Sequence, residues 1–249
     1  MPPDDQNPTM TTGPRPAGPT LAKPDSTSVR PWVTLEGING VGKTYLADRA
    51  VDQLGTRCVP LVELPDHDSD GLPGQVIHAL HATGDHFLQT GHPKTETLLL
   101  AALQVHRHEA TRLEAGQVVL EDRGPYSVAV YQAAVLCATA SLDEAFATAR
   151  TILDLLTQWR PLPTATLLIV DDPRLCRERF ERRTGRRASP GEVVLMERVA
   201  SLYDMFAATL PGPFAFEVLD RTKLDTDACV HRIVAACERV AATPTLEAR

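Results

Sequence analysis

A glycine-rich run near residue 40 has the residue types and spacing that bind a phosphate chain. It matches the pattern G-x-x-x-x-G-K-[ST]. Glycines let backbone N–H groups converge on an oxyanion without Cβ clashes, and a helix that starts there adds the positive end of its dipole. Lys43 is expected to reach the β- and γ-phosphates of ATP, and the Thr44 hydroxyl to ligate Mg²⁺. The predicted ATP-binding loop consists of Gly37, Asn39, Gly40, Val41, Gly42, Lys43 and Thr44.

Such a loop needs a strand before it and a helix after it, and its flanks predict both. Trp32–Glu36 is a short apolar run typical of a buried strand, and Gly42–Leu54 has a helical pattern. A second strand, Gln117–Glu121, is followed directly by Asp122. Because the carboxyl ends of parallel strands meet at one edge of a sheet, Asp122 is predicted to coordinate Mg²⁺ through water. The alternative for Asp122 is a helix N-cap or turn carboxylate.

Apolar runs alternate with helical stretches along the rest of the chain. They predict strands over Arg57–Val62, Ala165–Val170 and Phe214–Leu219, and helices over Leu98–Glu114, 126–138, 142–159, 173–183, 190–209 and 225–241. Continuous apolar strands separated by helices imply a parallel sheet that is covered on both faces. The expected fold class is therefore α/β, a P-loop nucleotide-binding fold with five parallel strands and helices on both faces of the sheet.

Composition narrows the classes of function and the organisation of the chain. A net charge of −7 argues against a nucleic-acid-binding surface, and the apolar runs are too short for a membrane-spanning helix. Five scattered cysteines without a C-x-x-C pair indicate core residues in a reducing cytoplasm. Residues 1–29 contain seven prolines and predict a disordered tail, either simply solvated or a partner-binding arm. Residues 30–249 are then expected to form a single domain.

Four stretches resemble, in the right order, the thymidylate kinase family of nucleoside monophosphate kinases. They are the loop with Leu35-Glu36 before it, Thr95–Ala102, the segment Asp122-Arg123 to Val130-Tyr131-Gln132, and Pro173–Arg187 with the following Glu197-Arg198-Val199 and Tyr203. The resemblance covers roughly residues 32–242. It implies ATP as phosphoryl donor, Mg²⁺ as cofactor, a small nucleotide as acceptor, and a homodimer.

The resemblance also implies roles for individual residues. Arg123 would contact the phosphate of the acceptor nucleotide, and Ser127, Tyr131 and Gln132 would line its pocket. Arg179 and Arg183 fall where the family places lid arginines that close over ATP. Such groups suit a phosphoryl transition state, whose charge is spread over its equatorial oxygens. The alternative for this stretch, with seven arginines between Arg174 and Arg187, is a solvated basic helix face paired with glutamates.

Four positions on the acceptor side depart from the family pattern. Asn39 replaces a loop carboxylate, and Glu63 stands where the family has a phosphate-gripping arginine. Leu100 replaces a base-stacking Phe, and Gln104 replaces a base-reading Arg, so that Gln104 either pairs with a base amide edge or faces solvent. Glu63 also suggests a general base for a hydroxyl acceptor, as in deoxynucleoside kinases, or an exposed acid at a strand end.

Three functions therefore remain from the sequence. The first is ATP-dependent phosphorylation of a nucleoside monophosphate, with dTMP as the leading acceptor. The second is a kinase of the same fold that acts on a deoxynucleoside or another small hydroxyl acceptor. The third is a nucleotide sensor that binds ATP without transferring phosphate. The retained Lys43, Thr44, Asp122 and Arg123, together with the lid arginines, favour a kinase over a sensor.

Overall fold

The computed structural model describes residues 30–62, 71–210 and 215–243, all within one compact unit, Val29–Thr245. The predicted tail, residues 1–29, and the candidate Glu63 lie outside the described residues. The elements are β1 (Trp32–Glu36), α1 (Lys43–Leu54), a 3₁₀ turn (Gly55–Arg57), β2 (Cys58–Leu61), α2 (Leu72–His81), α3 (Pro93–Ala110), β3 (Val118–Asp122), α4 (Pro125–Leu136), α5 (Leu142–Thr157), β4 (Ala165–Val170), α6 (Pro173–Thr184), α7 (Pro190–Thr209), β5 (Glu217–Asp220) and α8 (Thr226–Ala242).

The five strands form one parallel sheet in the order β2-β3-β1-β4-β5. β1 is central, because the chain adds β3 on one side of it and β4 on the other. Its Leu35 is in register with Asp122 of β3 and with Leu167 of β4. Ligands of open α/β sheets bind at the carboxyl ends of strands where the strand order reverses, and in this sheet that place is the end of β1.

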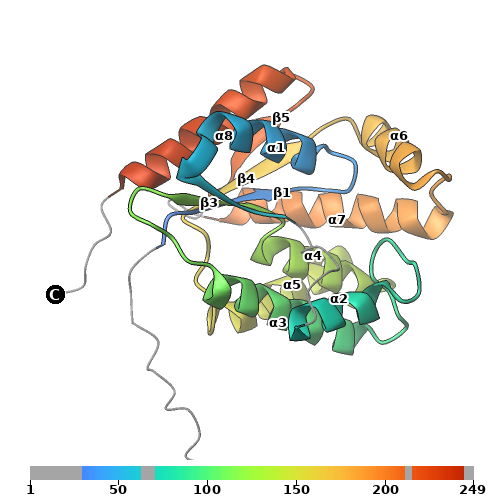
Figure 1. The fold of residues 1–249 in the computed structure, drawn as a ribbon. Helices are drawn as coiled ribbons and strands as arrows, with labels where there is room; N and C mark the ends of the chain where they lie inside the picture. The colour runs from blue at the N-terminus through green and yellow to red at the C-terminus, as the bar shows by residue number, and fades with distance from the viewer. Residues whose placement is uncertain (1–29, 63–70, 211–214, 244–249) are drawn as a thin grey trace, which may run out of the picture. The chain divides into compact units, whose positions relative to one another are not determined.

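Helices cover both faces of the sheet, which explains why β1 and β3 are buried along their whole length. α1 and α8 pack together on one face, whereas α4 packs among α3, α5 and α7 on the other (Figure 1). None of the helices in the described ranges is long and apolar enough to cross a membrane. All five cysteines are free thiols, and the core encloses four of them, Cys58, Cys176, Cys229 and Cys237.

The sequence predicts β1, β4 and α7 with their observed bounds, and most other elements to within a few residues. The prediction was wrong between Val62 and Leu98, where no element was expected and α2 forms. α3 begins at Pro93, five residues before the predicted start at Leu98. Its first turn is stabilised by the Glu96 carboxylate, which accepts hydrogen bonds from the backbone N–H groups of Thr90 and His92. β5 ends at Asp220, one residue beyond the prediction, and the predicted start, Phe214, lies outside the described residues.

Candidate functional site

The predicted phosphate-binding loop connects β1 to α1 and has the backbone geometry of an anion cradle. Gly37, Gly40 and Gly42 all have positive φ angles (137°, 78° and 95°). At Gly40 a side chain is excluded by space as well, because a Cβ would lie 1.9 Å from the carbonyl oxygen of Cys176 in α6. Lys43 is 5% exposed, and its Nζ donates to the carbonyl oxygens of Gly37 (2.9 Å) and residue 38 (3.1 Å). The Lys43 side chain thus lies along the loop, in the space that a phosphate would occupy.

Two oxygen ligands suited to Mg²⁺ meet beside this loop. The Thr44 hydroxyl, in the first turn of α1, donates to Oδ2 of Asp122 at 2.6 Å. Asp122 ends β3 and does not cap the next helix, since the N-cap of α4 is Gly124. The described residues hold no cluster of three His, Cys, Asp or Glu side chains that could bind a metal alone. A hydroxyl and a carboxylate are hard donors, and Mg²⁺ usually takes one or two protein ligands together with phosphate oxygens and water, so the pair fits that ion.

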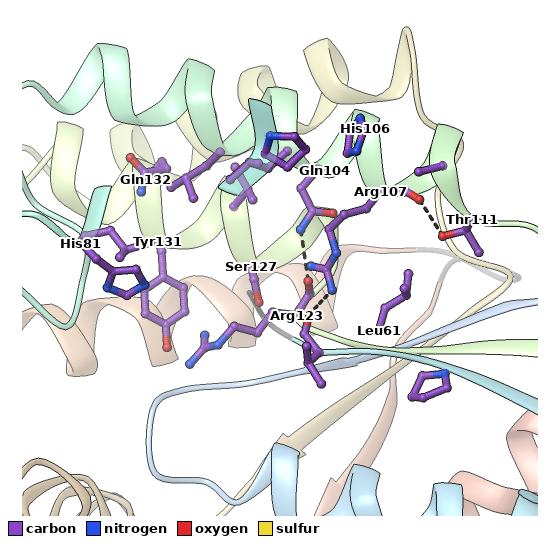
Figure 2. A pocket seen from close by; sticks show the side chains of 18 of the residues that line it. Leu61, His81, Gln104, His106, Arg107, Thr111, Arg123, Ser127, Tyr131 and Gln132 are labelled. Carbon is purple, nitrogen blue, oxygen red and sulfur yellow. Dashed lines mark hydrogen bonds between the residues drawn. The ribbon is translucent and has the colours of Figure 1, made fainter. Parts of the chain in front are cut away.

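Arg123 follows β3 in a strained conformation, with φ of 66° in a residue that is not glycine. Its backbone N–H donates to the carbonyl of Leu35 (3.1 Å), and its own carbonyl accepts from Nε2 of Gln104 (3.2 Å; Figure 2). The guanidinium donates to Oδ1 of Asn39 in the loop and lies over the ring of Tyr131, 4.9 Å from its centroid. Arg123 therefore connects the phosphate-binding loop with the cavity described next.

A cavity of about 1110 Å³ lies between the carboxyl ends of β2 and β3 and the helices α2, α3 and α4 (Figure 2). Apolar side chains dominate its wall, as is usual for a small-molecule site. Every predicted acceptor-side residue within the described ranges lines it. These residues are Leu100, Gln104, Arg123, Ser127, Tyr131 and Gln132. The loop residue Asn39 and the lid residue Arg183 line the same cavity.

The two glutamines of the cavity are fixed by hydrogen bonds. Gln104 is 5% exposed, so the alternative that it faces solvent is wrong. Its Nε2 must point to the Arg123 carbonyl, because a carbonyl only accepts hydrogen bonds, and its Oε1 has no hydrogen-bond partner among the described residues. Gln132 contacts the Thr97 hydroxyl (3.0 Å), which also bonds to the Pro93 carbonyl (2.7 Å). The Arg123 carbonyl therefore fixes which hydrogen-bonding edge Gln104 presents, while Thr97 holds the Gln132 side chain in place.

The two predicted lid arginines have different surroundings. Arg179 pairs with Asp171 (2.6 Å) and points at the loop, with 3.4 Å to the carbonyl oxygen of Gly40. Arg221 approaches the same carboxylate at 3.9 Å and donates to the Val41 carbonyl at 2.6 Å. Arg183 lies over the ring of Phe180 and reaches the cavity instead. The helix α6 therefore presents one arginine to the loop and one to the cavity.

Several charged residues near the site were not expected from the sequence. Glu121, buried completely, pairs with Arg160 (2.5 Å) and approaches Arg107 (3.6 Å), and it accepts from Nε1 of Trp32 (2.9 Å). Arg107 lines the cavity one helical turn beyond Gln104. The sequence signal was an acid inside an apolar strand, which needs a buried partner. Asp171 gave a weaker signal, as an acid directly after β4 at the same edge as Asp122.

A central parallel strand followed by a glycine-rich loop and a helix, in a sheet of order 2-3-1-4-5, defines the P-loop nucleotide-binding class of α/β folds. Within that class the chain has the fold of thymidylate kinases. It is similar to the enzyme from Candida albicans (TM-score 0.57, 17% identity, 84% of this chain and 92% of that chain). It is also similar to the enzyme from Ehrlichia chaffeensis (TM-score 0.55, 17% identity, 82% and 96%). No family model and no curated protein matches the sequence.

Proposed function

We propose that this protein transfers the γ-phosphoryl group of ATP to a nucleoside monophosphate, with dTMP as the leading acceptor. One observation carries the proposal. The Arg123 guanidinium bonds to Asn39 of the phosphate-binding loop and also lines the neighbouring cavity. This position supports a role for Arg123 between the proposed donor and acceptor sites, where phosphoryl transfer requires positive charge.

In this proposal the donor is held by the loop and the acceptor by the cavity. Lys43 and the loop N–H groups bind the β- and γ-phosphates, while Thr44 and Asp122 hold Mg²⁺. The bound ion would neutralise charge on the phosphate oxygens. Arg123 grips the acceptor phosphate, and Arg179 and Arg183 stabilise the charge that develops in transfer.

The polar groups of the cavity favour a nucleotide acceptor with a planar, hydrogen-bonding base. The amide of Gln104 is oriented by the Arg123 carbonyl, the Gln132 side chain is held by Thr97, and the ring of Tyr131 lies beside Arg123. Oriented amides discriminate between ligands because a mismatched ligand leaves a buried polar group unpaired. The replacement of larger family residues by Leu100 and Gln104 supports a test of several acceptors rather than dTMP alone.

The decisive experiment incubates the full chain with Mg²⁺-ATP and a panel of deoxynucleosides and their monophosphates. We expect ADP and a nucleoside diphosphate to form with dTMP or another pyrimidine monophosphate, and EDTA to stop the reaction. A Lys43→Met variant controls for contaminating kinases. If monophosphates are silent and a nucleoside is phosphorylated, the hydroxyl-acceptor kinase replaces this proposal. If ATP binds and no acceptor reacts, the sensor replaces it.

A further inference from the structure

Three side chains from distant parts of the sequence bring their oxygens together under the site. Glu36 ends β1, Ser127 lies in the first turn of α4, and Tyr203 lies in α7. The Ser127 hydroxyl donates to Glu36 Oε2 at 2.5 Å, and the Tyr203 hydroxyl donates to the same oxygen at 2.9 Å. The two hydroxyl oxygens are also 2.9 Å apart. We refer to these three residues as the Glu36 ring.

The Glu36 ring is almost completely closed to solvent, with exposed fractions of 0% for Glu36, 5% for Ser127 and 2% for Tyr203. Burial raises the pKa of Glu36, although the two hydroxyl donors act in the opposite direction. The Glu36 carboxyl thus accepts both buried hydroxyls at one oxygen, which brings Ser127 and Tyr203 within 2.9 Å of each other.

The Glu36 ring is connected directly to the strained turn at Arg123. Oε1 of Glu36 accepts the backbone N–H of Gly124 (3.1 Å), and the carbonyl of Leu35 accepts the backbone N–H of Arg123 (3.1 Å). The last two residues of β1 thus hold both amides that flank the Arg123 side chain. The approach is so close that a Cβ at Gly124 would lie 2.6 Å from the Thr34 side chain. A left-handed arginine persists only where its surroundings enforce it, and these bonds supply that constraint.

We infer that Glu36 and Tyr203 are positioning residues, which hold the Arg123 turn and Ser127 in the geometry that the acceptor requires. The inference rests on the proposed function, because Arg123 and Ser127 line the acceptor cavity. Neither Glu36 nor Tyr203 is among the residues that line this cavity, so both act through their neighbours. Tyr203 additionally connects the turn to α7, the helix that follows the arginine-rich α6 in the chain.

Tyr203→Phe tests the inference because it removes one hydroxyl and keeps the buried ring. Tyr126→Phe is the matched control, since Tyr126 is an equally buried tyrosine that packs against Phe206 of the same helix α7. With the acceptor found above, we expect Tyr203→Phe to raise the acceptor KM about tenfold, the size of one lost buried hydrogen bond. The Kd for ATP should stay within twofold. Equal losses for acceptor and ATP, or equal effects of the two variants, would overturn the inference.

A second measurement does not depend on activity, so it separates this inference from the proposed function. Hydrogen exchange of the peptide that spans the Arg123 turn should be faster in Tyr203→Phe than in wild type and in Tyr126→Phe. Unchanged exchange would refute the positioning role even if the enzyme is active. Glu36→Gln should keep the acceptor KM and the hydrogen exchange close to wild type. Its amide can still accept from the Gly124 N–H and can donate to both hydroxyls. Glu36→Ala should keep neither close to wild type.

Discussion

Lys43 is the residue whose replacement tests the donor site most directly. Its Nζ binds two loop carbonyls within the described structure and is expected to move onto the phosphates when ATP binds. Lys43→Met keeps the length of the side chain and removes its charge. We expect kcat to fall by a factor of about 100 or more, because charge stabilisation in the transition state is lost. The melting temperature should change by only a few degrees.

Steady-state kinetics and thermal melts of the same preparation check this outcome. Lys94→Met, on the first turn of α3, is the control for loss of a lysine elsewhere. A Lys43→Met enzyme with near-normal turnover would move the donor site away from the glycine-rich loop.

At the scale of residues, the sequence identifies the site residues that belong to a contiguous motif. It does not identify those that come together only in the folded protein. The loop from Gly37 to Thr44 needs no tertiary information, and Asp122 could be placed because strand ends share a sheet edge. By contrast, Glu36 and Tyr203 are 167 residues apart. Nothing local shows that a tyrosine of α7 donates to that carboxyl. Gln104 was left undecided because a helical pattern does not reveal that an amide donates to the backbone of another element.

At the scale of elements, the close contact between the phosphate-binding loop and α6 predicts that a side chain at Gly40 would clash. Gly40→Ala would require a side chain at φ of 78° and would place its Cβ 1.9 Å from the Cys176 carbonyl. α6 or the loop must then shift. We expect ATP affinity to fall at least tenfold and the melting temperature to drop, which calorimetry and thermal melts would measure.

Gly185→Ala is the matched control for Gly40→Ala. Gly185 ends α6 with a φ of 69°, but a Cβ there meets nothing within 4 Å. It therefore carries the backbone cost of about 1 kcal/mol without the clash. If the two variants bind ATP equally well, the close packing of α6 on the loop does not contribute to ATP binding.

The elements that the sequence predicted well are those whose signal is strong and local. β1 and β4 are uninterrupted apolar runs, and α7 starts with a serine cap at Ser189 whose side chain and Glu192 form a capping box. α2 and the first turn of α3 were not predicted because their residues include prolines, glycines and histidines, a composition that is typical of loops. Their helical state depends on tertiary packing, since Ile77 and Leu80 of α2 are buried against Leu103 of α3.

For the molecule as a whole, two ion pairs predict how stability depends on pH. The Arg186 guanidinium donates two hydrogen bonds to Glu192 and lowers the pKa of that carboxyl to about 2, from an ordinary 4.5. Lys223, followed by Thr222, lowers the pKa of Asp220 to about 2 as well. Because both folded-state values lie below the unfolded ones, their contribution is complete above about pH 4.5 and is lost as the pH falls through about 2.

Thermal melts between pH 7 and pH 2 test this dependence. Glu192→Gln should melt at a lower temperature than wild type at pH 7. The difference should shrink steadily below pH 4.5, where protonation makes the wild-type side chain neutral too. A difference that is constant with pH would show that the ion pair adds nothing and that the loss comes from the helix cap.

The burial of four thiols has a practical consequence for labelling. Removal from water raises the pKa of Cys58 and Cys229, that of Cys176 to about 11 and that of Cys237 to about 12, so little reactive thiolate forms near neutrality. Cys137, at the end of α4, is only partly buried. A maleimide fluorophore or nitroxide should therefore attach to the native chain at this one corner between α4 and α5, without any engineered cysteine.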